Sequence, residues 1–374
     1  MEPAQAANTV AWCGIALGLL FGLVANRCNF CTMGAVSDIV NMGDWGRMRS
    51  WLLAIAVGIL GTNLLAYTGY LDLAKTSYTG NVFPWLAYIV GGACFGVGMT
   101  LASGCGNKTM VRIGSGNLKS LVVLVFFGLT AMMTMKGALG VLRLNILQAP
   151  LFVAKLEPGQ SLPALLASIA GADLKTVQLV SACVVALLIG LWVFRDAEFR
   201  QQFDNKLAGV LIGLVVTAGW YVTGHLGLAE NPDTLELSYF GTNSHLAESM
   251  SFTAPTAYFL ELLSYWSDTG KSVTFGIATL IGVAIGSFIY ALAKNTFRLE
   301  HFSSSEDMLR HIAGAALMGF GGVTATGCSI GQGLTGMSTL SLGSLLATVS
   351  IVAGAATTMK LQYWMLMREP ALQT

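Results

Sequence analysis

The sequence contains little charge. Asp, Glu, Lys and Arg make up 10% of its 374 residues, whereas soluble globular chains have about 25%. Hydrophobic residues make up 54%, and the mean hydropathy is +0.67. A soluble fold of this size could not cover its surface with so few charges. We therefore expect an all-α polytopic membrane protein, and the net charge of +1 gives no reason to expect a nucleic-acid partner.

Signals of secretion, metal binding and catalysis are also missing. The seven cysteines lie mostly in or beside apolar segments rather than in the exposed loops of a secreted disulfide framework. The first ten residues have no basic region of a signal peptide, so we expect the first span to be retained. The one CxxC, "CNFC" at 28–31, has no second copy and no nearby histidine, which argues against zinc. No Walker-type loop or paired carboxylates stand out, and we expect no cofactor, metal or catalytic residue.

What the sequence does contain is a series of long apolar stretches. A helix needs about 20 mainly apolar residues to cross a bilayer. Nine stretches approach that length: about 9–26, 51–70, 83–104, 119–140, 176–195, 206–224, 273–293, 310–328 and 342–363. The sequence thus predicts about nine transmembrane helices in a single transmembrane domain, 1–374.

The distribution of Lys and Arg predicts the orientation of these spans. With the N-terminus outside and the C-terminus inside, fourteen of the 20 Lys and Arg residues fall inside, as the positive-inside rule requires. Two long segments, 141–175 and 225–272, then lie outside. Both mix apolar runs with Pro and Gly, and either can hold interfacial or re-entrant helices.

The sequence also contains an internal similarity. The stretch "GGACFGVGMTLASGC" (91–105) aligns without a gap with "GAALMGFGGVTATGC" (314–328), pairing Cys105 with Cys328. Upstream, "NFCTMGA" (29–35) faces "SFTAPTA" (251–257), so Cys31 corresponds to Thr253. We expect repeats over about 10–140 and 206–363, joined by a linking region of about 141–205.

One extra span between the repeats gives the second half the opposite orientation. Two inverted halves with the substrate path at their interface are typical of transporters. The alternative is chance similarity between membrane helices, in which Gly and Ala are common because they let backbones approach closely.

Glycines surround both aligned cysteines and predict breaks in the helices. Glycine permits positive φ and close approach of a ligand to the backbone. The freed N–H groups and the start of the next short helix would form a weakly positive cup suited to an anion. The thiols, buried away from positive charge, are expected to stay neutral. A neutral thiol suits a large soft anion with a terminal sulfur. For Cys13, Cys94 and Cys183 we favour simple packing.

Three motifs together resemble the YeeE/YedE family of bacterial inner-membrane sulfur transporters: "RCNFCTMGAVSD" (27–38), "GGACFGVGMTLASGCGNKTMVRIGSG" (91–116) and "GFGGVTATGCSIGQGLTGMSTLSLGSL" (319–345). The resemblance implies thiosulfate uptake across the inner membrane by an hourglass-shaped protein with short re-entrant helices. It further implies that the anion is passed between thiols at a constriction, and that a TusA-like cytoplasmic sulfur carrier is a candidate partner.

The resulting hypothesis is an importer of thiosulfate or a similar anion. Its substrate relay is Cys31, Cys105 and Cys328. The residues expected to shape or support the path are Arg27, Asp38, Gly104, Gly106, Asn107, Lys108, Thr253, Gly327, Ser329 and Gly331. Arg27 and Asp38 bracket the Cys31 segment and either pair with each other or lie in the headgroup layer. Lys108 stands where the family often has a smaller residue.

Three other interpretations stay open at this point. The protein is a membrane thiol enzyme or redox protein that transfers sulfane sulfur, a transporter of a selenium compound, or a passive anion channel. The enzyme would require an activated thiolate with an exposed mouth, and Lys108 near Cys105 is its best support.

Overall fold

The computed structural model describes every residue except 1, 233, 269 and 369–374. Its long helices are α1 (Pro3–Arg27), α3 (Gly46–Tyr67), α4 (Trp85–Leu101), α6 (Leu118–Lys136), α9 (Leu174–Phe194), α11 (Phe203–Tyr221), α13 (Phe275–Ala293), α14 (Ser305–Thr324) and α15 (Leu342–Arg368).

Shorter elements connect the long helices. The short helices are α2 (Thr32–Met42), α5 (Gly106–Gly114), α7 (Ala138–Leu142), α8 (Leu162–Ala170), α10 (Ala197–Gln201) and α12 (Thr253–Ser264). Tighter or wider helical turns are η1 (Leu73–Lys75), η2 (Arg143–Leu147), η3 (Pro150–Phe152), η4 (Val222–Leu226) and η5 (Gly331–Gly336). Strands β1 (Val82–Phe83) and β2 (Ala154–Lys155) pair antiparallel, as do β3 (Leu228–Glu230) and β4 (Leu237–Tyr239).

Each of the nine predicted spans coincides with one of the long helices, which confirms an all-α polytopic membrane protein. Within the described residues, eight segments are long and apolar enough to cross a membrane. The ninth, α14, carries Glu306, Asp307 and Arg310 in its first turns, so only its later turns are strongly apolar. Both long connecting segments contain short helices, as expected: α8 lies in 141–175, and α12 lies in 225–272.

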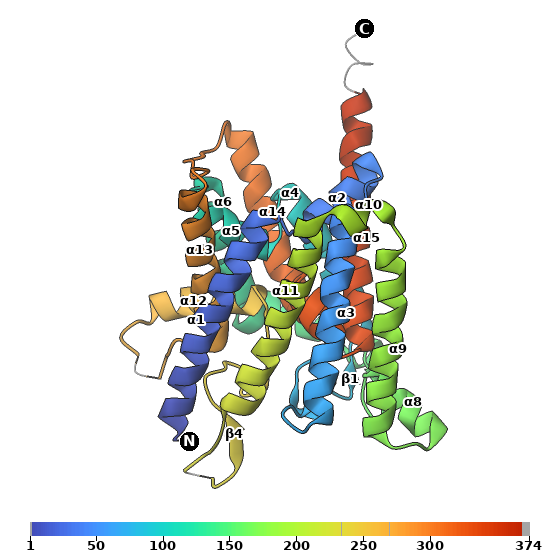
Figure 1. The fold of residues 1–374 in the computed structure, drawn as a ribbon. Coiled ribbons are helices and arrows are strands. Elements are labelled where there is room, and N and C mark those ends of the chain that lie inside the picture. The colour runs from blue at the N-terminus through green and yellow to red at the C-terminus, as the bar shows by residue number, and fades with distance from the viewer. Residues whose placement is uncertain (1, 233, 269, 369–374) are drawn as a thin grey trace.

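The two ends of the bundle differ (Figure 1). The N-terminus, β4 and α8 lie at one end, which we call the N-terminal face, and α2 and α10 lie at the opposite end. Because successive spans alternate in direction, segments 68–84, 137–173 and 222–274 all reach the N-terminal face. Pieces of the chain that are distant in sequence can therefore share one cavity there.

The long helices pack in reciprocal pairs. Helix α1 packs on α13 as α11 packs on α3, and α4 packs on α15 as α14 packs on α6. Helices α4 and α14 also pack on each other at the centre. The α4–α14 crossing is close because glycines meet there: a Cβ on Gly98 would lie 2.6 Å from the carbonyl oxygen of Gly314. Small residues of this kind let membrane helices approach closely, so this crossing fixes where the two helices end.

Candidate functional site

Three long helices stop inside the protein at breaks of the same local shape. Helices α1, α4 and α14 end at Arg27, Leu101 and Thr324, and in each case a cysteine is the fourth residue further on. The residue two positions before that cysteine is left-handed: φ is 51° at Asn29, 56° at Ser103 and 58° at Thr326. A short helix or turn follows, namely α2, α5 or η5. Cys31, Cys105 and Cys328 therefore occupy equivalent positions in three similar turns.

The expectation that glycine would supply the positive φ at these breaks is wrong. Gly104, Gly106, Gly327 and Gly331 all lie outside the left-handed region. A single polar residue can take that conformation at the end of a helix, and Asn does so most readily. The glycines instead provide space. A Cβ on Gly106 would lie 3.0 Å from Phe252 Cβ, and one on Gly331 would lie 2.8 Å from Ser251 Oγ.

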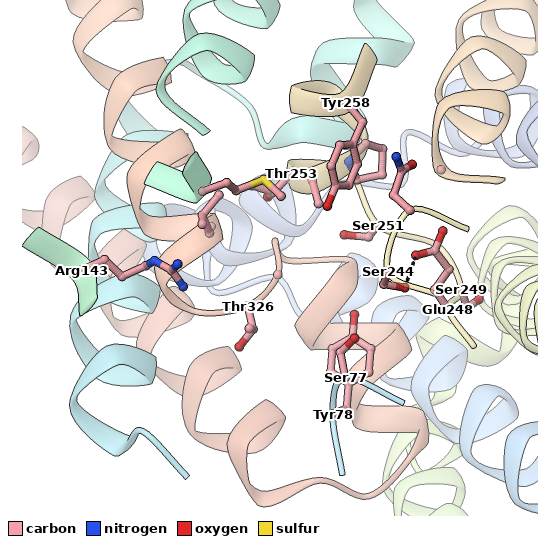
Figure 2. Close-up of a pocket in the computed structure, with 18 residues that line it drawn as sticks. Ser77, Tyr78, Arg143, Ser244, Glu248, Ser249, Ser251, Thr253, Tyr258 and Thr326 are labelled. Atoms are coloured by element: carbon pink, nitrogen blue, oxygen red, sulfur yellow. Dashed lines mark hydrogen bonds between the residues drawn. The ribbon is translucent and has the colours of Figure 1, made fainter. Parts of the chain in front are cut away.

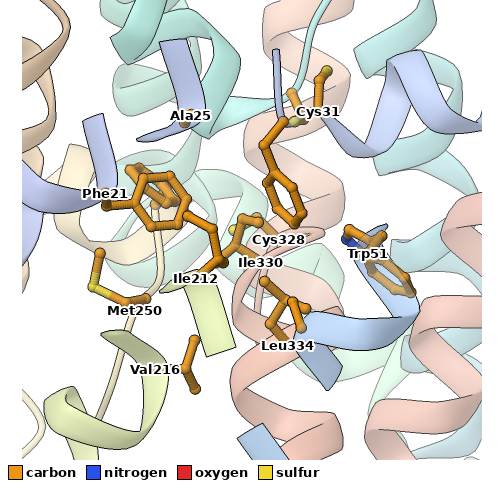
Figure 3. Close-up of a cluster of buried hydrophobic side chains, with 14 of the residues drawn as sticks. Phe21, Ala25, Cys31, Trp51, Ile212, Val216, Met250, Cys328, Ile330 and Leu334 are labelled. Atoms are coloured by element: carbon orange, nitrogen blue, oxygen red, sulfur yellow. The ribbon is translucent and has the colours of Figure 1, made fainter. Parts of the chain in front are cut away.

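The breaks bring the three cysteines into one buried core. The exposed fractions of Cys31, Cys105 and Cys328 are 5%, 0% and 1%, and all three belong to the same cluster of packed side chains. Figure 3 shows Cys31 at the upper edge of this cluster and Cys328 near its centre, beside Ile330. The side chains of Cys31 and Cys105 lie close enough for their thiols to interact electrostatically. Ser329, next to Cys328, approaches Cys105 and so connects the third break to the other two.

Backbone and side-chain groups also contact each sulfur. Gly34 N–H donates to Cys31 Sγ at 3.4 Å, and Gly331 N–H donates to Cys328 Sγ at 3.3 Å. The Cys105 thiol donates to Asn107 Oδ1 at 2.6 Å. The sulfurs of Cys31 and Cys328 thus accept a hydrogen bond from the first turn that follows the break, whereas the Cys105 thiol donates one. The thiols are held in fixed orientations rather than packed as plain apolar groups.

A buried polar group without a hydrogen bond lies beside each thiol. The side-chain atoms are Thr32 Oγ1, Asn107 Nδ2 and Ser329 Oγ, and none has a hydrogen bond of normal geometry. Trp51 Nε1, near Cys31, is a fourth. A buried donor without a partner costs about 1–3 kcal/mol, and such groups are rare. Donors left free beside three thiols favour a site that an anion occupies transiently.

Cations support the breaks on the side away from the N-terminal face. Lys108 Nζ donates to Asn29 Oδ1 at 2.5 Å, and Arg112 Nη1 donates to the Ser103 carbonyl at 2.7 Å. Both cations act electrostatically on Cys31, as does Arg47. The premise that the thiols lie away from positive charge is therefore wrong for Cys31.

The suggested pairing of Arg27 with Asp38 is not found. Arg27 pairs with Asp204 at 3.1 Å where both side chains are half exposed, and the buried Asp38 binds Arg47 through two guanidinium nitrogens. The physical reason is how the helices pack. Arg47, at the start of α3, lies next to α2, which carries Asp38, whereas Arg27, at the end of α1, lies next to α11, which carries Asp204. The Asp38–Arg47 pair holds the helix that carries Cys31.

Replacing Lys108 with methionine tests its contribution to anion binding. We expect KM for the transported anion to rise about tenfold or more, because a charged hydrogen-bonding partner contributes about 1.5–3 kcal/mol. Lys294→Met, an exposed lysine beyond the end of α13, is the matched control and should leave KM unchanged. Initial uptake rates against anion concentration measure both, and equal KM values in the two variants would contradict a binding role for Lys108.

A polar cavity of about 310 Å³ is lined by residues from the loops of the N-terminal face and from the third break. Figure 2 shows its lining side chains. The cavity reaches Thr326 and Gly327 at the third break, directly before Cys328. Thr253, which sequence alignment paired with Cys31, lines this cavity, and its hydroxyl has no partner. The residue at the position equivalent to Cys31, immediately before the first turn of α12, is Phe252, one position from the alignment. On the far side of the thiols, the gap beside Cys31, Arg47 and Trp51 has no room for a water molecule.

Several residues of this region were not predicted from the sequence. Arg143 on η2 and Glu248 in the loop before α12 both face the cavity. Tyr78 lines it as well, and its hydroxyl oxygen would lie 3.6 Å from a Cβ on Gly331. A single arginine in a largely apolar segment, "ALGVLRLNIL" (138–147), was a signal for Arg143. The sequence contains no sign that Glu248 and Tyr78 lie near the cysteines, because both residues belong to long loops whose course is not predictable from local pattern.

A bundle of membrane-spanning helices, broken at its centre by turns that present thiols beneath a polar cavity, defines a multi-pass membrane transporter. The family model described as "Sulphur transport" matches residues 27–357, and the chain belongs to this YeeE/YedE family of sulfur transporters.

Two relatives are similar over nearly their whole length. The chain is 27% identical over 383 residues to a protein named thiosulfate transporter TsuA from Escherichia coli (strain K12), covering 96% of this chain and 97% of that one. It is 26% identical over 351 residues to a protein of the same name from Spirochaeta thermophila, covering 92% and 96%. Family and relatives place the chain among transporters of sulfur anions rather than among enzymes.

Proposed function

We propose that the protein imports thiosulfate, or a closely related sulfur anion, through a central constriction in which Cys31, Cys105 and Cys328 act as a relay. The observation that carries this proposal is that three equivalent helix breaks bring Cys31, Cys105 and Cys328 into one buried cluster. The names of the two relatives support thiosulfate as the substrate.

The relay runs from the polar cavity to the opposite face. The anion first meets Cys328 below Thr326 and Gly327, then Cys105, then Cys31. Its terminal sulfur contacts one thiol at a time, while Ser329, Asn107 and Thr32 donate hydrogen bonds to its oxygens. Each partner is a neutral, moderate donor, so the anion is held and released at every step. The gap beyond Cys31 is too small for water, so a small movement of Arg47 or Trp51 admits the anion to the cytoplasmic side.

The reciprocal helix pairs support two inverted halves, 10–140 and 206–363, related across the α4–α14 crossing. We propose that the N-terminal face is periplasmic and the opposite face cytoplasmic, in a bacterial inner membrane. The location of Arg27, Arg47, Lys108 and Arg112 on the opposite face supports this orientation. A cytoplasmic TusA-like carrier is the proposed recipient of the imported sulfur.

Uptake by purified protein in liposomes tests the function. Radiolabelled thiosulfate should accumulate in proteoliposomes and not in protein-free vesicles. Unlabelled thiosulfate should compete far better than sulfate or sulfite, because neither has a terminal sulfur for the thiols to contact. Selenite is the third competitor, and stronger competition by selenite than by thiosulfate would replace the substrate with a selenium anion. Absence of thiosulfate uptake would refute the proposal.

The state of the thiols is testable separately. A relay with a neutral thiol at its centre predicts slow alkylation of Cys105 near neutral pH and faster alkylation only at clearly alkaline pH. Rapid alkylation of Cys105 near pH 7, read by mass spectrometry, would contradict the neutral thiol.

A further inference from the structure

The polar cavity contains one cation and one carboxylate that have no ion-pair partner among the described residues. Arg143 points into it from η2 (Figure 2), and its buried Nε has no hydrogen bond. Glu248 faces it from the opposite wall, where its carboxylate accepts a hydrogen bond from Ser244 Oγ at 3.2 Å. Thr253, 1% exposed, adds an unpartnered hydroxyl to the lining.

The position of Glu248 is fixed by its backbone. Its N–H donates to Thr223 Oγ1 at 3.1 Å, and its carbonyl accepts from the same hydroxyl. The backbone of Glu248 is therefore anchored at the cavity wall, where its side chain lines the cavity. Burial raises the pKa of Glu248 to about 7, because a carboxylate in a poorly solvated site is costly to ionise.

We propose that this cavity is the docking site for a doubly charged oxyanion held by Arg143, and that it admits the anion when Glu248 carries a proton. The inference rests on the proposed function, since it takes the cavity as the entrance to the relay. The guanidinium is suited to an oxyanion because its planar donors match two oxygens at once. An ionised Glu248 in the same cavity would cancel that attraction.

The other titratable groups around Glu248 do not compensate for its charge. Tyr78 from the loop after η1 and Tyr258 from α12 line the same cavity, and burial, together with nearby negative charge, raises the pKa of both phenols. Their hydroxyls are therefore neutral donors. His245 lies three residues earlier and lines the neighbouring cavity of about 320 Å³ with Lys136 and Lys271, whose charges are paired with Glu261. Among the described residues that line this cavity, Arg143 is the only cation.

The direction of the pH effect follows from these charges. Below about pH 7 Glu248 is neutral and the cavity is positive, so the anion docks. Above that pH the carboxylate is negative, and docking requires a proton to be taken up from the periplasmic solution. The proton returns to that solution when the anion moves on to Cys328. Protonation of Glu248 therefore controls docking of the anion and does not couple transport to a proton gradient.

The test is initial uptake of radiolabelled thiosulfate by proteoliposomes, at concentrations far below KM, with external pH varied and internal pH fixed. Between pH 6 and pH 8 wild-type uptake should fall about tenfold, the change in protonated fraction for one group that titrates near 7. Glu248→Gln should give uptake that is nearly independent of pH. Glu236→Gln, an exposed acidic residue just before β4, is the matched control and should follow the wild type. A Glu248→Gln profile identical to the wild-type profile would overturn the inference.

Reaction of the wild-type protein with a carbodiimide, which modifies protonated carboxyl groups, separates this inference from the proposed function. Modification of Glu248 should fall as pH rises through 7, and thiosulfate should slow it at pH 6. If the liposomes take up no thiosulfate at any pH, the proposed function fails. The docking site then stands if thiosulfate slows the modification and is refuted if thiosulfate has no effect.

Discussion

Uptake of thiosulfate is expected to fall about a hundredfold when Cys105 is replaced by alanine. Cys105 is fully buried, interacts electrostatically with Cys31 and donates to Asn107. In the proposed relay it is the central thiol. Losing a hydrogen bond to a charged group costs about 1.5–3 kcal/mol, and each 1.36 kcal/mol is a tenfold change in rate. Initial uptake rates in proteoliposomes of matched protein content measure the loss.

Two other variants give this prediction its controls. Cys183→Ala changes an exposed thiol on α9 and should transport at the wild-type rate. Cys105→Ser keeps a donor in place of the soft sulfur, so it should transport better than the alanine variant and well below the wild type. Near-normal uptake by Cys105→Ala would show that the anion passes without this thiol.

The second large effect is expected at the α4–α14 crossing. A Cβ on Gly98 would lie 2.6 Å both from the Gly314 carbonyl oxygen and from the Met318 backbone nitrogen. Neither backbone group can move without shifting a helix, so Gly98→Val should destabilise the protein by at least about 2 kcal/mol. Because the crossing also fixes where α4 and α14 end, uptake should be lost together with stability.

The matched control for this crossing is Gly190→Val. Gly190 lies within α9, where an added Cβ would meet nothing within 4 Å. The thermal midpoint of the detergent-solubilised protein and the yield of monodisperse protein should fall for Gly98→Val and stay unchanged for Gly190→Val. Equal midpoints in the two variants would show that the crossing tolerates a larger separation than its glycines indicate.

The spans and the cysteine breaks were predictable because both leave a local signal in the sequence. An apolar stretch of about 20 residues has few structural alternatives in a membrane, and α1, α6, α9 and α13 all formed where such stretches were found. The breaks at Cys105 and Cys328 were marked by clustered glycines. The prediction that glycine would take the positive φ was wrong, because Ser103 and Thr326 take the left-handed conformation. The sequence does not specify which residue at a helix end adopts a positive φ.

Contacts between distant segments were not predictable in the same way. Arg27 and Asp38 are near in sequence, yet their partners are Asp204 and Arg47, because the helices that carry them diverge. Glu248 reaches the cavity through a loop held by Thr223. Such pairings depend on how the spans are arranged in space, which periodicity and composition do not specify.

The central claim, that the anion travels past the three buried sulfurs, is tested most directly by locating a bound anion. Selenosulfate carries selenium in place of the terminal sulfur, and anomalous diffraction from crystals grown with it would mark that atom alone. The account predicts selenium peaks within contact distance of Cys328, Cys105 or Cys31. Peaks confined to positions remote from all three thiols, in protein that transports selenosulfate, would contradict it.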